Sequence, residues 1–69
     1  MLKCRIERFT YCFVERVAEI WLADGNCTDM EGAIKYVMRI DTKAITIITW
    51  SGGKRDTVYM RIDGEWKAS

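Results

Sequence analysis

The sequence predicts a small α+β domain in which two helices cover one face of an antiparallel or mixed sheet of three or four strands. Two observations lead to this prediction. Apolar residues recur at helical spacing over residues 11–39, and β-branched and aromatic residues crowd residues 44–68, where glycine-containing turns divide them. The expected order is strand, helix, helix, strand, strand, strand. Residues 1–69 should form one domain, and a chain of this length buries only about 60% of its unfolded surface.

The first two predicted elements differ in periodicity. Apolar and charged residues alternate over residues 2–8, which predicts a strand. Over residues 11–23 the apolar residues gather on one helical face and the charges on the opposite one, which predicts an amphipathic helix. Thr10 would cap its start and Gly25 its end. The apolar face of this predicted helix comprises Phe13, Val14, Val17, Ala18 and Trp21.

A second helix is expected after a capping box. Thr28 and Glu31 have the spacing at which a hydroxyl and a carboxylate each bind a free backbone donor at a helix start. The helix should end near Arg39. Its buried side is expected to comprise Met30, Ala33, Ile34, Val37 and Met38.

Three strands should follow, over residues 44–50, 57–62 and 65–68. Asp63-Gly64 is a strong hairpin signal. A three-residue turn with a bulge at Gly64 would pair Arg61 with Glu65 and Met60 with Trp66, which matches charge with charge and apolar with apolar. We therefore expect this register. It would put Val58, Met60, Trp66 and Ala68 on one face and Tyr59, Arg61, Glu65 and Lys67 on the other.

The composition gives little support for catalysis or metal binding. The chain has no histidine, and its 11 basic residues nearly balance its 10 acidic ones. Three cysteines without a pairing pattern, and no secretory segment, predict a cytoplasmic protein with free thiols, among which only Cys27 could be a nucleophile. Residues 24–35 begin like a calcium loop but place Asp29 and Lys35 where glycine and glutamate are required. We expect no enzyme activity, cofactor, metal or membrane span.

The function is argued from surplus apolar side chains. Residues 44–50 are apolar on both sides, whereas two helices cover only one sheet face. We expect a protein-interaction module, such as an inhibitor or regulator of a larger assembly. Homodimerisation would use the same surface and could coexist with that function. The alternative is a nucleic-acid-binding domain that uses the loop after Trp50. The expected partner-binding residues are Ile48, Trp50, Tyr59 and Arg61, and those of the alternative are Trp50, Lys54, Arg55 and Tyr59.

Overall fold

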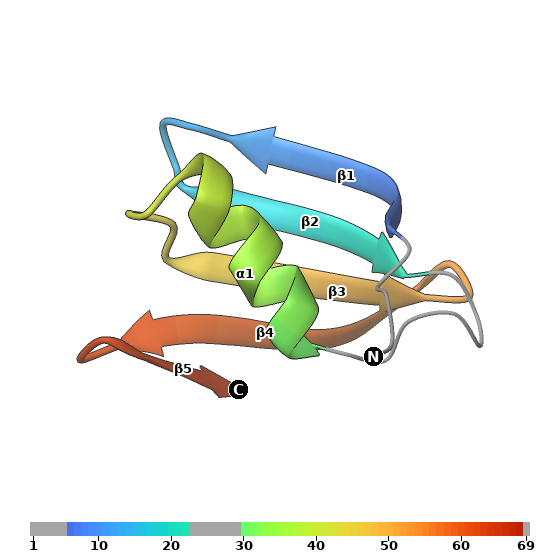
Figure 1. Cartoon of the computed structure of the whole chain (residues 1–69). Coiled ribbons are helices and arrows are strands. Elements are labelled where there is room, and N and C mark those ends of the chain that lie inside the picture. Colours follow the sequence, from blue (N-terminus) through green and yellow to red (C-terminus); the bar gives the residue numbers. More distant parts are fainter. Residues whose placement is uncertain (1–5, 23–29, 69) are drawn as a thin grey trace.

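A computed structural model describes residues 6–22 and 30–68 of the chain. Within these residues, five strands and one helix follow one another in the order β-β-α-β-β-β (Figure 1). Their bounds are β1 Ile6–Cys12, β2 Val17–Leu22, α1 Met30–Ile40, β3 Thr46–Ser51, β4 Lys54–Ile62 and β5 Glu65–Ala68.

All five strands form one mixed sheet, and their order in the sheet is their order in the chain. Three of the four strand pairs are antiparallel, while β2 and β3 are parallel. A parallel pair needs a long crossover connection, and α1 lies within that connection. Figure 1 shows α1 lying obliquely across the middle strands on one face. We call this side the covered face and the opposite side the open face.

The core lies between α1 and the covered face. Ala33 and Val37 on α1 are fully buried, as are Ala18 and Ile20 on β2 and Ile47 on β3. The predicted second helix is therefore confirmed over Met30–Ile40, with Ala33 and Val37 buried and Met30 and Ile34 partly buried against the core. Thr49 is also buried on this face, and its hydroxyl donates to the Thr57 carbonyl at 3.3 Å. The cap predicted at Thr28 lies outside the described residues.

The predicted first helix is wrong, and with it the β-α-α-β-β-β order and the two-helix cover. Residues 11–22 instead hold the end of β1, a four-residue loop, and β2. Phe13 and Val14, which suggested a helical face, lie in that loop and are 65% and 89% exposed. The loop closes through the Arg16 N–H, which donates to the Cys12 carbonyl at 2.7 Å, while Arg16 adopts a positive φ of 54°. β1 begins within the predicted strand, whose residues 2–5 lie outside the described ones.

The predicted turn between β4 and β5 is also wrong. Asp63 and Gly64 both have positive φ, at 53° and 80°, and form a two-residue turn of the kind that matches strand twist. This turn pairs Ile62 with Glu65 and Arg61 with Trp66. Trp66 consequently shares the covered face with Tyr59 and packs against the core. The two-residue turn matches the right-handed twist of the two strands. This preference outweighs the pairing of Arg61 with Glu65 that a three-residue turn would allow.

Candidate functional site: the open face of the sheet

The open face carries large side chains with no layer of the described chain above them. Because side chains alternate along a strand, burial of Ala18, Ile20 and Ile47 under α1 places their chain neighbours on the opposite side. The strand registers then align these neighbours in rows across the sheet. One row contains Arg8, Trp21, Trp50 and Arg55; the next contains Thr10, Glu19, Ile48 and Val58; a third contains Cys12, Val17, Thr46, Met60 and Lys67.

The first of these rows, which we call the tryptophan row, is a continuous stack. The rings of Trp21 and Trp50 are parallel within 5°, with centroids 5.1 Å apart. The guanidinium of Arg8 lies 5.3 Å from the Trp21 ring centroid and that of Arg55 lies 5.6 Å from the Trp50 centroid. Since the order across the sheet is β1, β2, β3, β4, each ring has the other ring on one side and an arginine on the other.

Strand pairing in register builds this stack. The parallel pairing of β2 with β3 places Trp21 beside Trp50. A β-bulge in β4 then shifts the register, so that Trp50 pairs with Arg55 while Asp56 is left without a partner position. Bulges commonly re-aim a side chain beside a functional site. Here the bulge sets an arginine, rather than a carboxylate, across from the tryptophan.

The turn between β3 and β4 approaches the tryptophan row at Trp21. Gly53 has a φ of 78°, which glycine adopts without strain. A Cβ at Gly53 would lie 3.9 Å from the six-membered ring of Trp21, so the backbone of this turn runs close to that ring. The side chains of Lys54 and Arg55 follow directly and are exposed.

The arginines of the row keep their hydrogen-bonding capacity. A guanidinium that stacks on an aromatic ring still directs its N–H groups sideways, where a carboxylate or phosphate can bind. Neither Arg8 nor Arg55 forms an ion pair with any described residue, although Glu7 and Asp56 adjoin them in the chain. Trp50 adds an unmet donor, because its indole N–H is shielded from solvent and has no hydrogen-bond partner among the described residues.

Aliphatic side chains continue the open face away from the tryptophan row. Ile48 and Val58 are paired across β3 and β4 and are only partly buried. Met60 and Ile62, farther along β4, are 43% and 47% exposed. Together with the tryptophans, they form an apolar band whose charged neighbours are Glu19, Glu65, Lys67 and the two arginines of the row.

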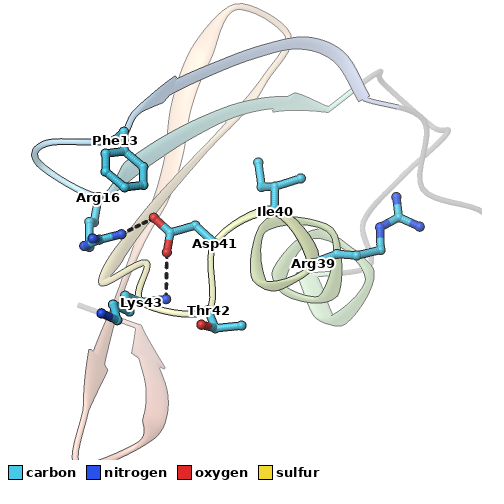
Figure 2. A pocket seen from close by; sticks show the side chains of 7 residues that line it. All are labelled: Phe13, Arg16, Arg39, Ile40, Asp41, Thr42 and Lys43. Atoms are coloured by element: carbon cyan, nitrogen blue, oxygen red, sulfur yellow. Dashed lines mark hydrogen bonds and ion pairs between the residues drawn. The ribbon is translucent and has the colours of Figure 1, made fainter.

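A hollow at the end of α1 is lined by residues that support the fold. The hollow has a volume of about 300 Å³ and lies between the β1–β2 loop and the loop after α1. Both carboxylate oxygens of buried Asp41 are engaged, one by Arg16 and the other by the Lys43 N–H at 2.8 Å. Figure 2 shows the Arg39 side chain pointing away from this pair. The cations around the hollow therefore do not converge on a common point.

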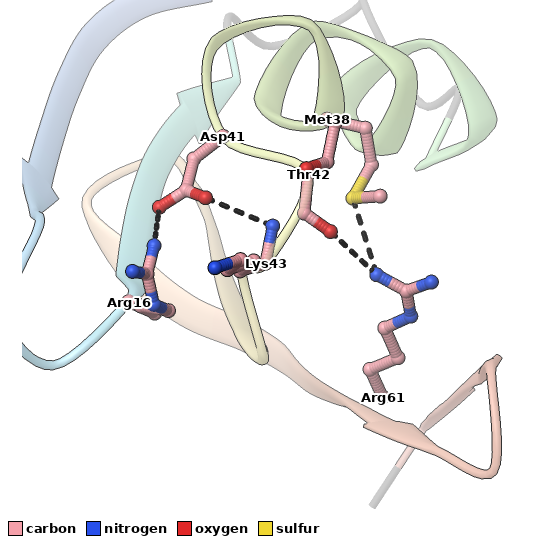
Figure 3. A network of polar contacts seen from close by, with 6 residues as sticks. All are labelled: Arg16, Met38, Asp41, Thr42, Lys43 and Arg61. Carbon is pink, nitrogen blue, oxygen red and sulfur yellow. Dashed lines mark hydrogen bonds and ion pairs between the residues drawn. The ribbon is translucent and has the colours of Figure 1, made fainter.

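The structure separates the four expected partner-binding residues. Ile48 and Trp50 lie on the open face, whereas Tyr59 packs against the core on the covered face. Arg61 donates to the Thr42 carbonyl at 2.8 Å and contacts the Met38 sulfur at 3.8 Å, so it braces the loop after α1 (Figure 3). Of the residues expected for nucleic-acid binding, Trp50 and Arg55 belong to the tryptophan row and Lys54 adjoins it, while Tyr59 does not.

Sequence reasoning misses Trp21 and Arg8 as members of the site. The helical pattern places Trp21 on the buried side of a helix. Arg8 ends the predicted first strand and, with Lys3 and Arg5, forms a basic edge that is not among the expected site residues. The alternation of Ala18, Ile20 and Leu22 is the signal that identifies β2 and places Trp21 on the other face.

No grouping among the described residues indicates a reaction. They contain no cluster of three or more potential metal-ligating side chains, and Cys12 is a free, exposed thiol. Cys27 and the loop that resembles a calcium site lie outside the described residues. No helix in the described part of the chain has the length and apolar character needed to cross a bilayer.

No protein-family model, curated protein or solved structure matches this chain.

Proposed function

We propose that this domain is a small, non-enzymatic protein-interaction module that inhibits or regulates a larger assembly by docking through the open face of its sheet. The observation that carries the proposal is the difference between the two faces. α1 buries one of them, while the other carries the half-buried Trp21, Trp50 and Ile48 and the exposed Met60 in one band. Contiguous apolar surface of this kind marks interaction sites on small domains.

The residues of the band suit an interface. Tryptophan and arginine are the side chains that most often dominate binding energy, and methionine is also enriched at interfaces. The tryptophan row is rigid, because stacking and strand pairing fix both rings before any partner arrives. A preorganised surface loses less side-chain entropy on binding. A second copy of the chain could use the same surface, so homodimerisation belongs to the proposal as a second mode of contact.

Affinity capture from native cell extract tests the proposal, followed by reconstitution with the purified partner. Trp50→Ala should weaken binding of that partner at least tenfold. Phe13→Ala is the matched control, because Phe13 is also aromatic and 65% exposed but lies in the β1–β2 loop. Equal binding by both variants would contradict the proposal, as would a monomer that captures nothing and binds no hydrophobic dye.

Nucleic-acid binding is the second candidate, and Lys54 together with the tryptophan row favours it. Single-stranded nucleic acids bind where bases stack on aromatic rings beside cations. It ranks second because both ring faces already have stacking neighbours, so a base would have to displace Arg8 or Arg55. A tryptophan fluorescence change on adding a thymidine oligonucleotide at low salt, reversed by added salt, would support it. No change at low salt would remove it.

The proposal assigns the chain to the reducing cytoplasm. An exposed free thiol at Cys12 suits that compartment better than an oxidising one.

A further inference from the structure

We infer that the occupant of the open face is an acidic segment of another protein chain, whose carboxylates bind Arg8 and Arg55 while its apolar side chains lie on the band between them and Met60. This inference rests on the proposed function and names the chemistry of its partner. It is carried by the charges at the two ends of the tryptophan row and by the geometry of the stacked arginines.

The row is cationic at both ends. Arg8 on β1 and Arg55 on β4 flank the two rings, and the row itself contains no carboxylate. Each guanidinium lies over a ring, and its N–H groups remain available. Carboxylates bind such a fork through two parallel hydrogen bonds, which makes the contact both stronger and more directional than contact with a lysine.

The surface between the two arginines is less suited to a nucleic acid or to a second copy of this chain than to an acidic peptide. A nucleic acid would gain two phosphate contacts here but would find no free ring face, and Ile48 and Val58 offer its bases no hydrogen bonds. A second copy, docked face to face, would bring two sets of these arginines into one apolar interface. Glu19 in the neighbouring row would be its only acidic counterpart within the three rows. An acidic, partly apolar peptide satisfies both the arginines and the band.

A displayed library of random peptides, each about 10 residues long to span the sheet in extended form, tests this inference directly when selected against the intact chain. The wild-type chain should enrich peptides in which aspartate or glutamate flanks apolar residues. Those peptides should bind the Arg8→Glu/Arg55→Glu variant at least tenfold more weakly, and that variant should enrich lysine- and arginine-containing peptides instead. Lys35→Glu is the control for charge alone, because Lys35 is exposed on α1 on the covered side. It should bind the acidic peptides as the wild type does.

Charge reversal can also damage the fold, so Arg8→Gln/Arg55→Gln is tested alongside. It should keep the thermal midpoint of the wild type and still lose most of the affinity for the acidic peptides. Salt should weaken the wild-type interaction and leave that of the glutamine variant nearly unchanged.

The remaining outcomes overturn the inference. Enriched peptides that are apolar, and indifferent to either double variant, would leave the proposed function standing but remove its acidic partner. Tight binding of a thymidine oligonucleotide that the double variants lose would assign the surface to nucleic acid. A dimer by light scattering that the double variants dissociate would assign it to a second copy. No enrichment at all, from a monomeric chain, would reject both this inference and the proposed function.

Discussion

Ile47 and Ile48 are consecutive residues of β3, yet they belong to two different kinds of surface. Ile47 points beneath α1 and is fully buried in the core, where Tyr59 is its cross-strand partner. Ile48 points to the open face, where its row neighbours are Glu19 and Val58 and the adjacent row consists of stacked tryptophans and arginines. The covered face is buried under α1, whereas the Trp21 and Trp50 rings lie on the face that α1 does not cover. The buried apolar residues of the described chain all belong to the cluster on the covered side, so we expect that side to supply most of the stability.

Matched truncations on β3 probe this division most strongly. Ile47→Ala should lower the free energy of unfolding by about 3 kcal/mol, because it leaves a cavity under α1. Ile48→Ala should lower it by about 1 kcal/mol, since the removed methyl groups are only partly buried. Urea denaturation of both variants measures the difference. Equal losses would show that the open face contributes to the core as much as the covered face does.

The ion pairs of the covered side should show the next largest effect. Arg16→Met leaves the buried Asp41 carboxylate without its cation and should cost about 2 kcal/mol. The pair between Lys35 and Glu31 spans 3.3 Å, but both side chains are at least 75% exposed. Lys35→Met should therefore change stability by less than about 0.5 kcal/mol. Thermal denaturation that ranks the two variants in the reverse order would refute this account of Asp41.

The β4–β5 turn determines which face Trp66 occupies, and its glycine should matter less. Gly64 has a φ of 80°, and a Cβ added to it would meet nothing within 4 Å, so only backbone strain opposes a side chain there. Gly64→Ala should cost about 1 kcal/mol. Asp63→Gly, which relaxes the neighbouring positive φ, should be close to neutral by the same denaturation assay. A neutral Gly64→Ala would indicate that this hairpin does not hold its two-residue turn in solution.

The smallest expected effect concerns a hydroxyl. The Tyr11 hydroxyl is buried and has no hydrogen-bond partner among the described residues. Tyr11→Phe should leave stability unchanged or raise it by up to about 1 kcal/mol, because it removes an unmet polar group. A loss of stability in chemical denaturation would reveal a hydrogen bond that this residue makes in solution.

The parts of the fold that follow from sequence are those with one apolar face. α1 is predictable because its apolar residues recur at helical spacing while Glu31 and Lys35 share the outer side; the apolar residues are Met30, Ala33, Ile34, Val37 and Met38. The strands after residue 44 are predictable from their β-branched composition, and the place of the last hairpin from Asp63-Gly64.

The first half of the chain misleads because both faces of β2 carry apolar residues. Val17 and Trp21 on the open face lie next to Ala18 and Ile20 on the covered face, and Glu19 is the only charged residue of the strand, so the alternation is obscured and the pattern also fits a helix. The loop before β2 contains no glycine, asparagine or proline to mark it, and Arg16 adopts the left-handed conformation that glycine or asparagine usually supplies. The feature that makes the open face a docking candidate is thus the same one that conceals β2 and leaves Trp21 out of the expected site.

The parallel pairing of β2 with β3 has a consequence for how the chain reaches this fold. β1 with β2, and β3 with β4 and β5, are hairpins that can close locally and quickly. The seam between these two halves forms only after the intervening segment with α1 has been brought together, which carries a loop-closure entropy that hairpins avoid. The slow step of folding should therefore be the joining of the halves, and the Trp21–Trp50 stack, which spans that seam, should report it as a late change in tryptophan fluorescence.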